Sequence, residues 1–141
     1  MDGREFVSLV KLESITWPVS IILKKLNSPR ALQPLPESSD PIEKGGFDFN
    51  NRAAQVEQSR AAWFQQLSED QKAVLSEVLR ECAELSALSF CTLIDGVGGS
   101  FDGVFKIHAV DPSGKVTLIN SDDSEMLHDL LTEVCAEDWE C

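Results

Sequence analysis

The sequence has few basic residues, and none of them lies in its acidic C-terminal stretch. It contains 12 lysines and arginines against 24 aspartates and glutamates, so its formal net charge is −12. A surface potential of this sign repels nucleic acids and anionic membranes. We therefore expect no direct binding to DNA, RNA or membrane surfaces, and we expect a protein partner to present a basic surface.

The sequence also lacks the pattern of a membrane span or a leader. We identify no apolar run near the roughly 18 to 20 residues that cross a bilayer. The opening MDGREFVSLVK lacks the charged, apolar and small-residue order of a signal peptide. These features predict a cytoplasmic protein. In a reducing cytosol Cys82, Cys91, Cys135 and Cys141 are expected to be free thiols, with Cys82 buried on the apolar side of a helix.

Histidine and cysteine are spaced unfavourably for a metal site. Neither Cys-x-x-Cys nor His-x-x-x-His occurs, and His128, Cys135 and Cys141 are seven and six residues apart, whereas structural zinc sites use closely spaced pairs. The glycine-rich run GVGGSFDG lacks the preceding strand and the following helix and lysine of a phosphate-binding loop. No nucleophile elbow is recognisable. We expect no metal, no cofactor and no enzymatic activity.

The first part of the chain predicts helices separated by a loop. Apolar residues at helical spacing predict a short helix that is interrupted at Trp17. Pro18 suits the first turn of a second helix that ends near Pro29. Prolines, glycines and serines then predict a linker or ordered loop over about 28–51. A further helix is expected to begin near Asn51.

A long helix in the middle of the chain has the clearest boundaries. Ser68 and Gln71 in the run SEDQ predict a capping box, with the helix beginning at Glu69. Asp95 and Gly96 are expected to end it. Apolar residues at three- and four-residue intervals predict the face that packs on the core. These are Val74, Leu75, Val78, Leu79, Cys82, Leu85 and Leu88.

A β-hairpin is predicted after the long helix. Residues 103–110 and 115–120 alternate apolar and polar side chains. Between them, DPSG fits a type I turn that begins at Asp111. On the second strand we expect Val116 and Leu118 to face the core. An isolated hairpin is only marginally stable, so its apolar side is expected to pack on the long helix.

A final helix is expected from about Ser124 to Cys135, with its leucines facing inward. The sequence therefore predicts an α+β fold over residues 1–141, organised as a single domain. It is mainly helical, with a long central helix packed against a C-terminal β-hairpin and a final short helix.

The C-terminal stretch is strongly acidic. Eight aspartates and glutamates and no lysine or arginine lie between Ser121 and Cys141. Acids at the start of a helix complement its dipole, but acids at its C-terminal end do not. Trp139 lies among them and is of a type enriched at interfaces. Both a solvated tail and an interaction surface fit this pattern. The candidate partner-binding residues are Asp129, Glu133, Glu137, Asp138, Trp139 and Glu140.

The run LSEDQKAVLSEVLRECAELSALSFCTLIDGVGG, followed by a hairpin and LINSDDSEMLHDLL, resembles a group of small uncharacterised bacterial proteins. The resemblance covers residues 67–131, and its motifs are structural rather than catalytic. The chain departs from the group in its proline-rich insertion and in its acidic extension past Leu131. Such proteins are often accessory proteins of toxin systems. The resemblance therefore implies an immunity protein that inhibits a cognate toxin by occluding its active site.

Two other functions remain open at this point. A small enzyme or ligand-binding domain would use a cleft between the long helix and the hairpin, near His108 and Asp95. A regulatory interaction protein without a toxin partner would need no cleft. The sequence does not define the oligomeric state.

Overall fold

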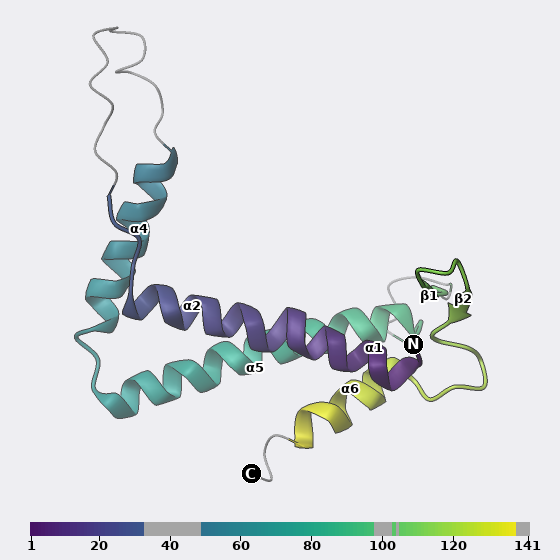
Figure 1. Ribbon diagram of the computed structural model, residues 1–141. Coiled ribbons are helices and arrows are strands. Elements are labelled where there is room, and N and C mark those ends of the chain that lie inside the picture. The colour runs from purple at the N-terminus through teal and green to yellow at the C-terminus, as the bar shows by residue number, and fades with distance from the viewer. Residues whose placement is uncertain (33–48, 98–102, 104, 138–141) are drawn as a thin grey trace, which may run out of the picture. The chain divides into compact units, whose positions relative to one another are not determined.

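The computed structural model of the chain describes residues 1–32, 49–97, 103 and 105–137, without the side chains of 49–51. The fold is α+β, as predicted (Figure 1). Most of the predicted loop over about 28–51 lies outside the described residues. The elements are α1 Gly3–Val10, the π-helical η1 Lys11–Thr16, α2 Trp17–Asn27, α4 Phe49–Phe64, α5 Glu69–Ile94, β1 His108–Val110, β2 Val116–Leu118 and α6 Leu127–Ala136.

The chain forms two compact units. The first unit comprises residues 1–19 and 77–141, and the second unit comprises residues 20–76. Helices α2 and α5 each contribute residues to both. Compactness alone does not show whether the units fold separately. The single domain over residues 1–141 therefore stays a prediction.

The N-terminal helix is continuous through a proline. Residues Gly3 to Asn27 are all helical, so the predicted interruption at Trp17 is wrong. The π-helical segment η1 ends two residues before Pro18. Proline has no N–H to donate, and its ring crowds the carbonyl one turn earlier. A widened π turn at that point accommodates the ring without a break in the helix.

The same helix is long and apolar enough to cross a membrane by length and composition, with a mean hydropathy of 1.5 in its most apolar window. The expectation of no apolar run near 18 to 20 residues is therefore wrong for this helix, because it depended on a break at Trp17. A mostly buried core helix and an N-terminal signal sequence satisfy the same criteria. Only 11% of this window is buried, and Val7 and Ile15 are its residues in the core of the first unit, with 0% and 3% of their surface exposed.

The core of the first unit lies where the N-terminal helix, α5, the hairpin and α6 meet. Its buried members are Val7, Ile15, Ala87, Cys91, Ile94, Ile119, Leu127, Leu130, Leu131, Val134 and Cys135. The leucines of α6 therefore face inward, as predicted. Gly3 allows a close approach of α1, because a Cβ atom there would lie 3.1 Å from Leu130 Cδ1 and 3.7 Å from the carbonyl oxygen of Ile119.

In the second unit, charged side chains connect α2 to α4. Lys25 Nζ lies 3.0 Å from Oε1 of Glu57, whose side chain is only 13% exposed. This hydrogen bond is the main cause that lowers the pKa of Glu57 below its ordinary value. At the end of α4, the buried ring of Phe64 lies 5.5 Å from Lys72 Nζ.

The start of α5 confirms the predicted capping box. Ser68 Oγ accepts a hydrogen bond from the Gln71 N–H at 3.2 Å, and Gln71 Oε1 accepts one from the Ser68 N–H at 2.9 Å. The helix begins at Glu69, as expected. This boundary could be predicted because both hydrogen bonds join residues three positions apart.

The predicted core face of α5 is only partly correct. The buried residues of the helix are Ala87, Cys91 and Ile94. Four members of the predicted stripe are exposed, namely Val74, Val78, Cys82 and Leu85. The prediction that Cys82 is buried is therefore wrong. Apolar residues occupy two faces of this helix, and only the face with Ala87, Cys91 and Ile94 packs on the core.

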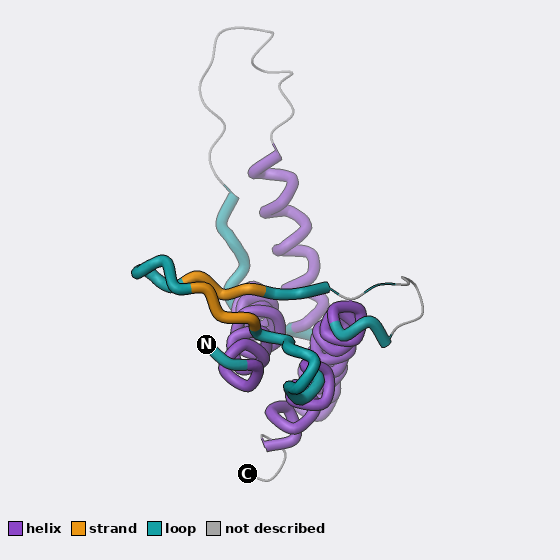
Figure 2. Tube along the Cα trace, turned by 90° about the vertical axis from the view of Figure 1, so that its right-hand side faces the viewer, coloured by secondary structure: helices purple, strands orange, loops and turns teal. Residues whose placement is uncertain are grey.

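The hairpin is present at the predicted place (Figure 2, strands in orange). Strands β1 and β2 are antiparallel, with Ala109 opposite Thr117. In the turn, the Gly114 N–H donates to the Asp111 carbonyl at 2.9 Å, which confirms the DPSG turn. Gly114 has a φ of 84°, a conformation that favours glycine and is typical of a three-residue hairpin loop.

The register of the hairpin corrects the predicted face of β2. Val116 and Leu118 are exposed, whereas Ile119 is 3% exposed. Residues directly opposite each other in an antiparallel pair point to the same side of the sheet. The Ile119 N–H donates to the Ile107 carbonyl at 2.8 Å. Because Ile107 packs on the core, its opposite residue Ile119 does so too, and Val116 and Leu118 face outward.

Candidate partner-binding surface

Three of the predicted partner-binding residues form a row along α6 and its C-cap residue, Glu137. Asp129, Glu133 and Glu137 are spaced four residues apart, and 61%, 55% and 62% of their side-chain surface is exposed. Positions with this spacing share one face of a helix and rise about 6 Å per step. We call these three residues the acidic row. The other predicted members, Asp138, Trp139 and Glu140, lie outside the described residues.

Arg4 of α1 pairs with two members of the acidic row. Its Nη1 donates to Glu133 Oε2 at 3.1 Å, and its Nη2 donates to Glu137. The hydrogen bond to Glu133, followed by the charge of Glu137, raises the pKa of Arg4 above its ordinary value. The helix dipole does not explain why Glu133 and Glu137 lie at the C-terminal end of α6. Their contacts with Arg4 do. Three carboxylates and one guanidinium leave a charge of −2 on the surface.

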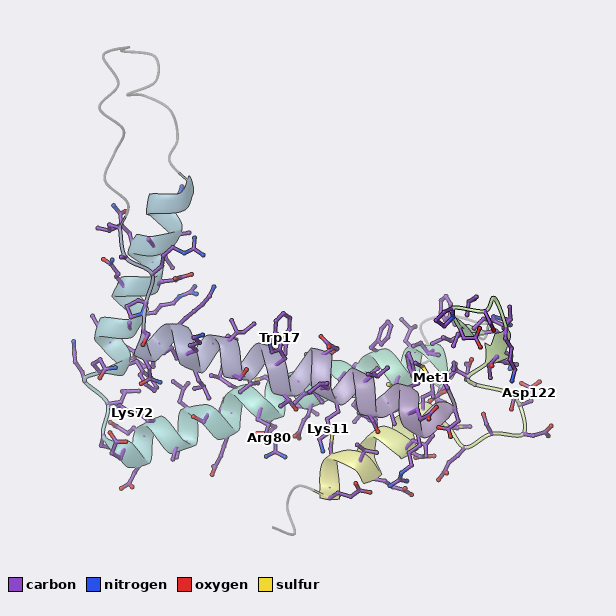
Figure 3. The ribbon with its side chains drawn as sticks, in the orientation of Figure 1. Met1, Lys11, Trp17, Lys72, Arg80 and Asp122 are labelled. Atoms are coloured by element: carbon purple, nitrogen blue, oxygen red, sulfur yellow. The ribbon has the colours of Figure 1, made fainter. Side chains whose placement is uncertain are left out.

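Lys11 holds the C-terminal end of α6. Its Nζ donates to the Val134 carbonyl at 2.7 Å, on the side of the N-terminal helix that faces α6 (Figure 3). The last carbonyls of a helix lack partners within the helix, and a cation there complements the dipole. Two cations from the N-terminal helix, Arg4 and Lys11, therefore fix the position of the acidic row.

The end of α5 positions Asp95. Gly96 adopts a φ of 74°. The N–H groups of Gly96 and Val97 donate to the carbonyls of Leu93 and Thr92 at 3.2 and 3.1 Å. This is the Schellman arrangement, which needs a residue with positive φ after the helix. The predicted end of the long helix is therefore correct.

The carboxylate of Asp95 caps α6. Its side chain is 4% exposed, and its Oδ2 accepts a hydrogen bond from the His128 N–H at 2.9 Å and lies 2.8 Å from His128 Nδ1. Met126, the N-cap residue of α6, makes no side-chain cap. The helix therefore begins at Leu127 rather than near Ser124, because its cap comes from 33 residues earlier in the chain.

The three described cysteines differ in accessibility. Cys82 is exposed, whereas Cys91 and Cys135 are buried. Burial, followed by the negative charge of Asp95, raises the pKa of Cys91 from 9.0 to about 11. Because the thiolate is the reactive form of cysteine, this shift lowers the reactive fraction at neutral pH about 100-fold, in addition to the effect of burial.

We expect N-ethylmaleimide at pH 7.5 to modify Cys82 in the native protein and to modify Cys91 and Cys135 only after unfolding. Mass spectrometry of proteolytic peptides gives the labelling rate at each site. Labelling in denaturing urea is the control, since all three thiols are then accessible. Equal native rates at Cys82 and Cys91 would contradict the burial of Cys91.

A polar cleft of about 180 Å³ lies beside Asp95. Lys106 and Asp122 are among its lining residues, and the Lys106 ammonium lies 2.5 Å from Asp122 Oδ1. His108 is exposed on β1 and does not line this cleft. The imidazole next to Asp95 is instead that of His128. Among the described residues, no three His, Cys, Asp or Glu side chains are grouped so that they could hold a metal ion.

Comparison with protein-family models, with curated proteins and with solved structures gives no match for this chain. A function must therefore be inferred from the geometry of the molecule. The best-defined polar feature of the first unit is the acidic row, held by Arg4 and Lys11 at one end of α6 and by Asp95 at the other.

Proposed function

We propose that the protein is a cytoplasmic immunity protein that binds and inhibits a cognate bacterial toxin without catalysis. The acidic row supports this proposal most directly. Its three carboxylates are more than half exposed although two of them pair with Arg4. They are therefore available to a partner in a fixed arrangement. Preorganised side chains lose little conformational entropy when a partner binds.

Charge supports a basic partner. The chain carries a net charge of −12, and −8 of this lies between Ser121 and Cys141. Complementary charge accelerates protein association and suppresses wrong partners. Toxins that act on nucleic acids or nucleotides need basic residues around the substrate. An inhibitor that covers such residues with carboxylates excludes the substrate by occupying its site.

The N-terminal helix has a structural role in this proposal rather than a membrane-spanning one. Arg4 and Lys11 on this helix bond to α6, and Val7 and Ile15 are buried in the same core. Inserting the helix into a bilayer would break these contacts and transfer Lys11 and Glu13, in the middle of the helix, into hydrocarbon. The helix instead positions the surface that binds the toxin.

The proposal is tested with the product of the gene adjacent to the one that encodes this chain. We expect that product to arrest growth when expressed alone and to be tolerated when this chain is co-expressed. Purified proteins should form a complex whose association rate falls steeply with salt. Absence of toxicity, or of a complex between the two proteins, would overturn the assignment to this partner.

We expect the triple substitution Asp129→Asn, Glu133→Gln and Glu137→Gln to slow association with the toxin about tenfold at low salt. The reason is the loss of the charge that steers the basic partner. Stopped-flow fluorescence measures the rate. A matched control, Glu13→Gln with Asp70→Asn and Asp123→Asn, removes the same number of exposed charges elsewhere and should retain most of the rate.

The single substitution Arg4→Gln sharpens this test. It removes the cation that pairs with Glu133 and Glu137, so the acidic row becomes more negative. We expect association with the toxin at low salt to become faster even though α1 loses a contact with α6. If both the triple variant and Arg4→Gln left the association rate unchanged, the acidic row would not be the binding surface.

A further inference from the structure

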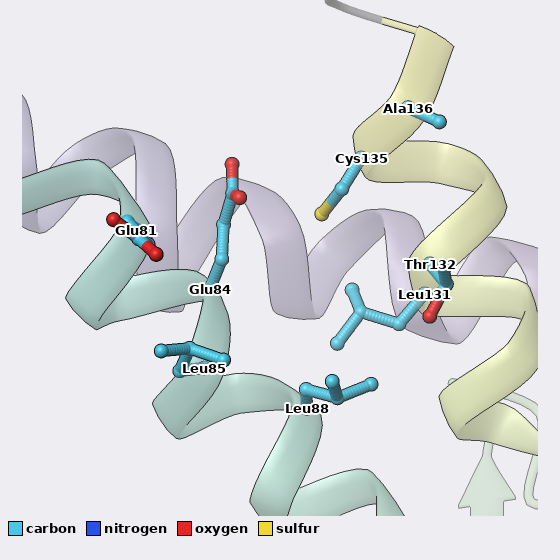
Figure 4. Close-up of a pocket in the computed structure, with 8 residues that line it drawn as sticks. All are labelled: Glu81, Glu84, Leu85, Leu88, Leu131, Thr132, Cys135 and Ala136. Carbon is cyan, nitrogen blue, oxygen red and sulfur yellow. The ribbon is translucent and has the colours of Figure 1, made fainter. Parts of the chain in front are cut away.

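An apolar groove runs between α5 and α6 in the first unit (Figure 4). Its volume is about 270 Å³, and its apolar lining consists of Leu85, Leu88, Leu131, Cys135 and Ala136. Leu131 is 1% exposed, whereas Leu85 is 55% exposed. The groove therefore extends from the core to an open surface.

Carboxylates border this groove on the α5 side. Glu81 and Glu84 line it together with Leu85 and Leu88 (Figure 4). Arg80 Nε lies 2.8 Å from Glu84 Oε1 and compensates one charge, and the carboxylate of Glu81 stays exposed. An exposed apolar surface beside exposed carboxylates distinguishes this groove from the core of the first unit.

Beside the groove, α5 carries an exposed apolar row, of which only Leu85 also lines the groove. Val78, Cys82 and Leu85 follow each other at four- and three-residue intervals and are all exposed. Three acids with the same intervals, Glu77, Glu81 and Glu84, each precede one of them by one residue. Two parallel rows result, one apolar and one acidic.

We propose that this groove, together with the apolar row beside it on α5, binds a basic amphipathic helix of a partner protein. Two helices pack along each other through rows of side chains at three- and four-residue intervals, so a docking helix with apolar anchors at this spacing would match the apolar row on α5. Lysines or arginines beside those anchors would meet Glu77 and Glu81. An anionic membrane is repelled by these carboxylates, and a second copy of the chain brings the same net charge of −12.

This inference deepens the proposed function and rests on it in one respect, namely that the partner is a protein. On α6, the groove residues Thr132 and Ala136 lie next to Glu133 of the acidic row in the helix. A toxin that inserts a basic helix into the groove therefore also places basic residues near the acidic row. The groove supplies apolar contact area, and the acidic row supplies charge.

A synthetic peptide provides a probe that does not depend on the identity of the toxin. It has about 18 residues, long enough to form a helix, with leucines at three- and four-residue intervals and lysines elsewhere. A second peptide of the same composition places its leucines at alternate positions. Fluorescence anisotropy with the full chain is expected to show binding that is about tenfold tighter for the helical pattern.

Cys82 locates the bound peptide. This thiol is exposed on the apolar row, so saturating peptide should slow its modification by N-ethylmaleimide at least about fivefold in a Cys141→Ser background. Labelling with the alternate-position peptide is the control. If the helical peptide bound but left the labelling rate at Cys82 unchanged, the binding site would lie elsewhere and the inference would be overturned.

Substitutions test the two rows separately. Val78→Gln with Leu85→Gln should weaken peptide binding about tenfold, whereas Val110→Gln with Val116→Gln, two exposed apolar residues of the hairpin, should not. Glu77→Gln with Glu81→Gln should reduce the salt dependence of binding. Equal affinity of the Val78 and Leu85 variant and the hairpin variant would also overturn the inference.

The toxin experiment separates failure of the groove from failure of the proposed function. If the Val78 and Leu85 variant still inhibits the toxin while the acidic-row variant does not, the proposed function stands and the groove inference fails. If peptide binding passes all of these tests but the adjacent gene product neither is toxic nor binds, the groove inference stands and the immunity assignment fails.

Discussion

Replacing Asp95 by alanine is expected to lower the free energy of unfolding by about 2–4 kcal/mol. The carboxylate is 4% exposed and accepts the N–H of His128 in the first turn of α6, with the imidazole Nδ1 of the same residue at 2.8 Å. Alanine leaves both groups without this partner in a partly buried environment, and such groups are costly. Urea denaturation followed by circular dichroism measures the change.

Two further variants show how much the Asp95 carboxylate contributes to the free energy of unfolding. Asp95→Asn keeps one oxygen that can accept the His128 N–H, so we expect it to lose about half as much stability as alanine. Asp129→Ala, a carboxylate on the exposed face of the same helix turn, should change stability by less than about 0.5 kcal/mol. A similar loss for Asp95→Ala and Asp129→Ala would show that the cap contributes little.

The effect of Asp95 on function is expected to be indirect. Its side chain is buried and belongs to neither the acidic row nor the groove. Its cap fixes the start of α6, and both of those surfaces lie on α6. We therefore expect Asp95→Ala to slow toxin association by disordering the first turn, and Asp95→Asn to restore most of the rate.

Local signals in the sequence predicted three element boundaries correctly, although the break at Trp17 and the start of α6 near Ser124 were wrong. The capping box of Ser68 and Gln71, the turn from Asp111 to Gly114 and the helix end at Gly96 each depend on residues at most five positions apart. Backbone geometry and side-chain hydrogen bonds fix such units without help from the rest of the fold. These boundaries could therefore be derived from residue types alone.

Faces of elements were predicted less well, because packing decides them. Both candidate stripes on α5 are apolar, so periodicity does not identify the one that packs, and Cys82 was placed on the wrong face. On the second strand, Val116 and Ile119 are equally apolar and point to opposite sides. The register of the hairpin with Ile107 selects Ile119.

In the candidate site, too, some features could be predicted from the sequence and others could not. The charge pattern predicted a surface on the final helix, and Asp129, Glu133 and Glu137 do share an exposed face. The groups that hold this face could not be found from the sequence. Arg4 and Asp95 lie 129 and 33 residues away from their partners on α6, and nothing in local periodicity connects such positions.

Helix α6 thus presents three faces with different chemistry. Its buried face supplies core residues such as Leu127 and Leu130, its exposed face supplies the acidic row, and a third face lines the groove through Thr132 and Ala136. Because α6 has only 10 residues, the core, the acidic row and the groove together involve most of its surface. Substitutions on this helix are therefore expected to affect stability and binding in separable ways.

Leu131→Ala is expected to lower the free energy of unfolding by about 2–5 kcal/mol, which is the cost of removing a buried leucine side chain when the cavity collapses only in part. Leu131 is 1% exposed and belongs both to the core cluster and to the lining of the groove. A domain whose stability exceeds about 6 kcal/mol, within the usual range of about 5–15 kcal/mol, stays mostly folded at room temperature after this loss. Urea denaturation measures the change.

Leu127→Ala is the matched comparison for Leu131→Ala. Leu127 is 0% exposed in the same core and lies one turn earlier on α6, but it does not line the groove. The two variants should lose similar stability, because each removes the same buried atoms. Only Leu131→Ala should also weaken the binding of the leucine and lysine peptide, since it removes part of the groove wall. Equal peptide affinities for the two variants would mean that Leu131 supports the fold and contributes no contact to the ligand.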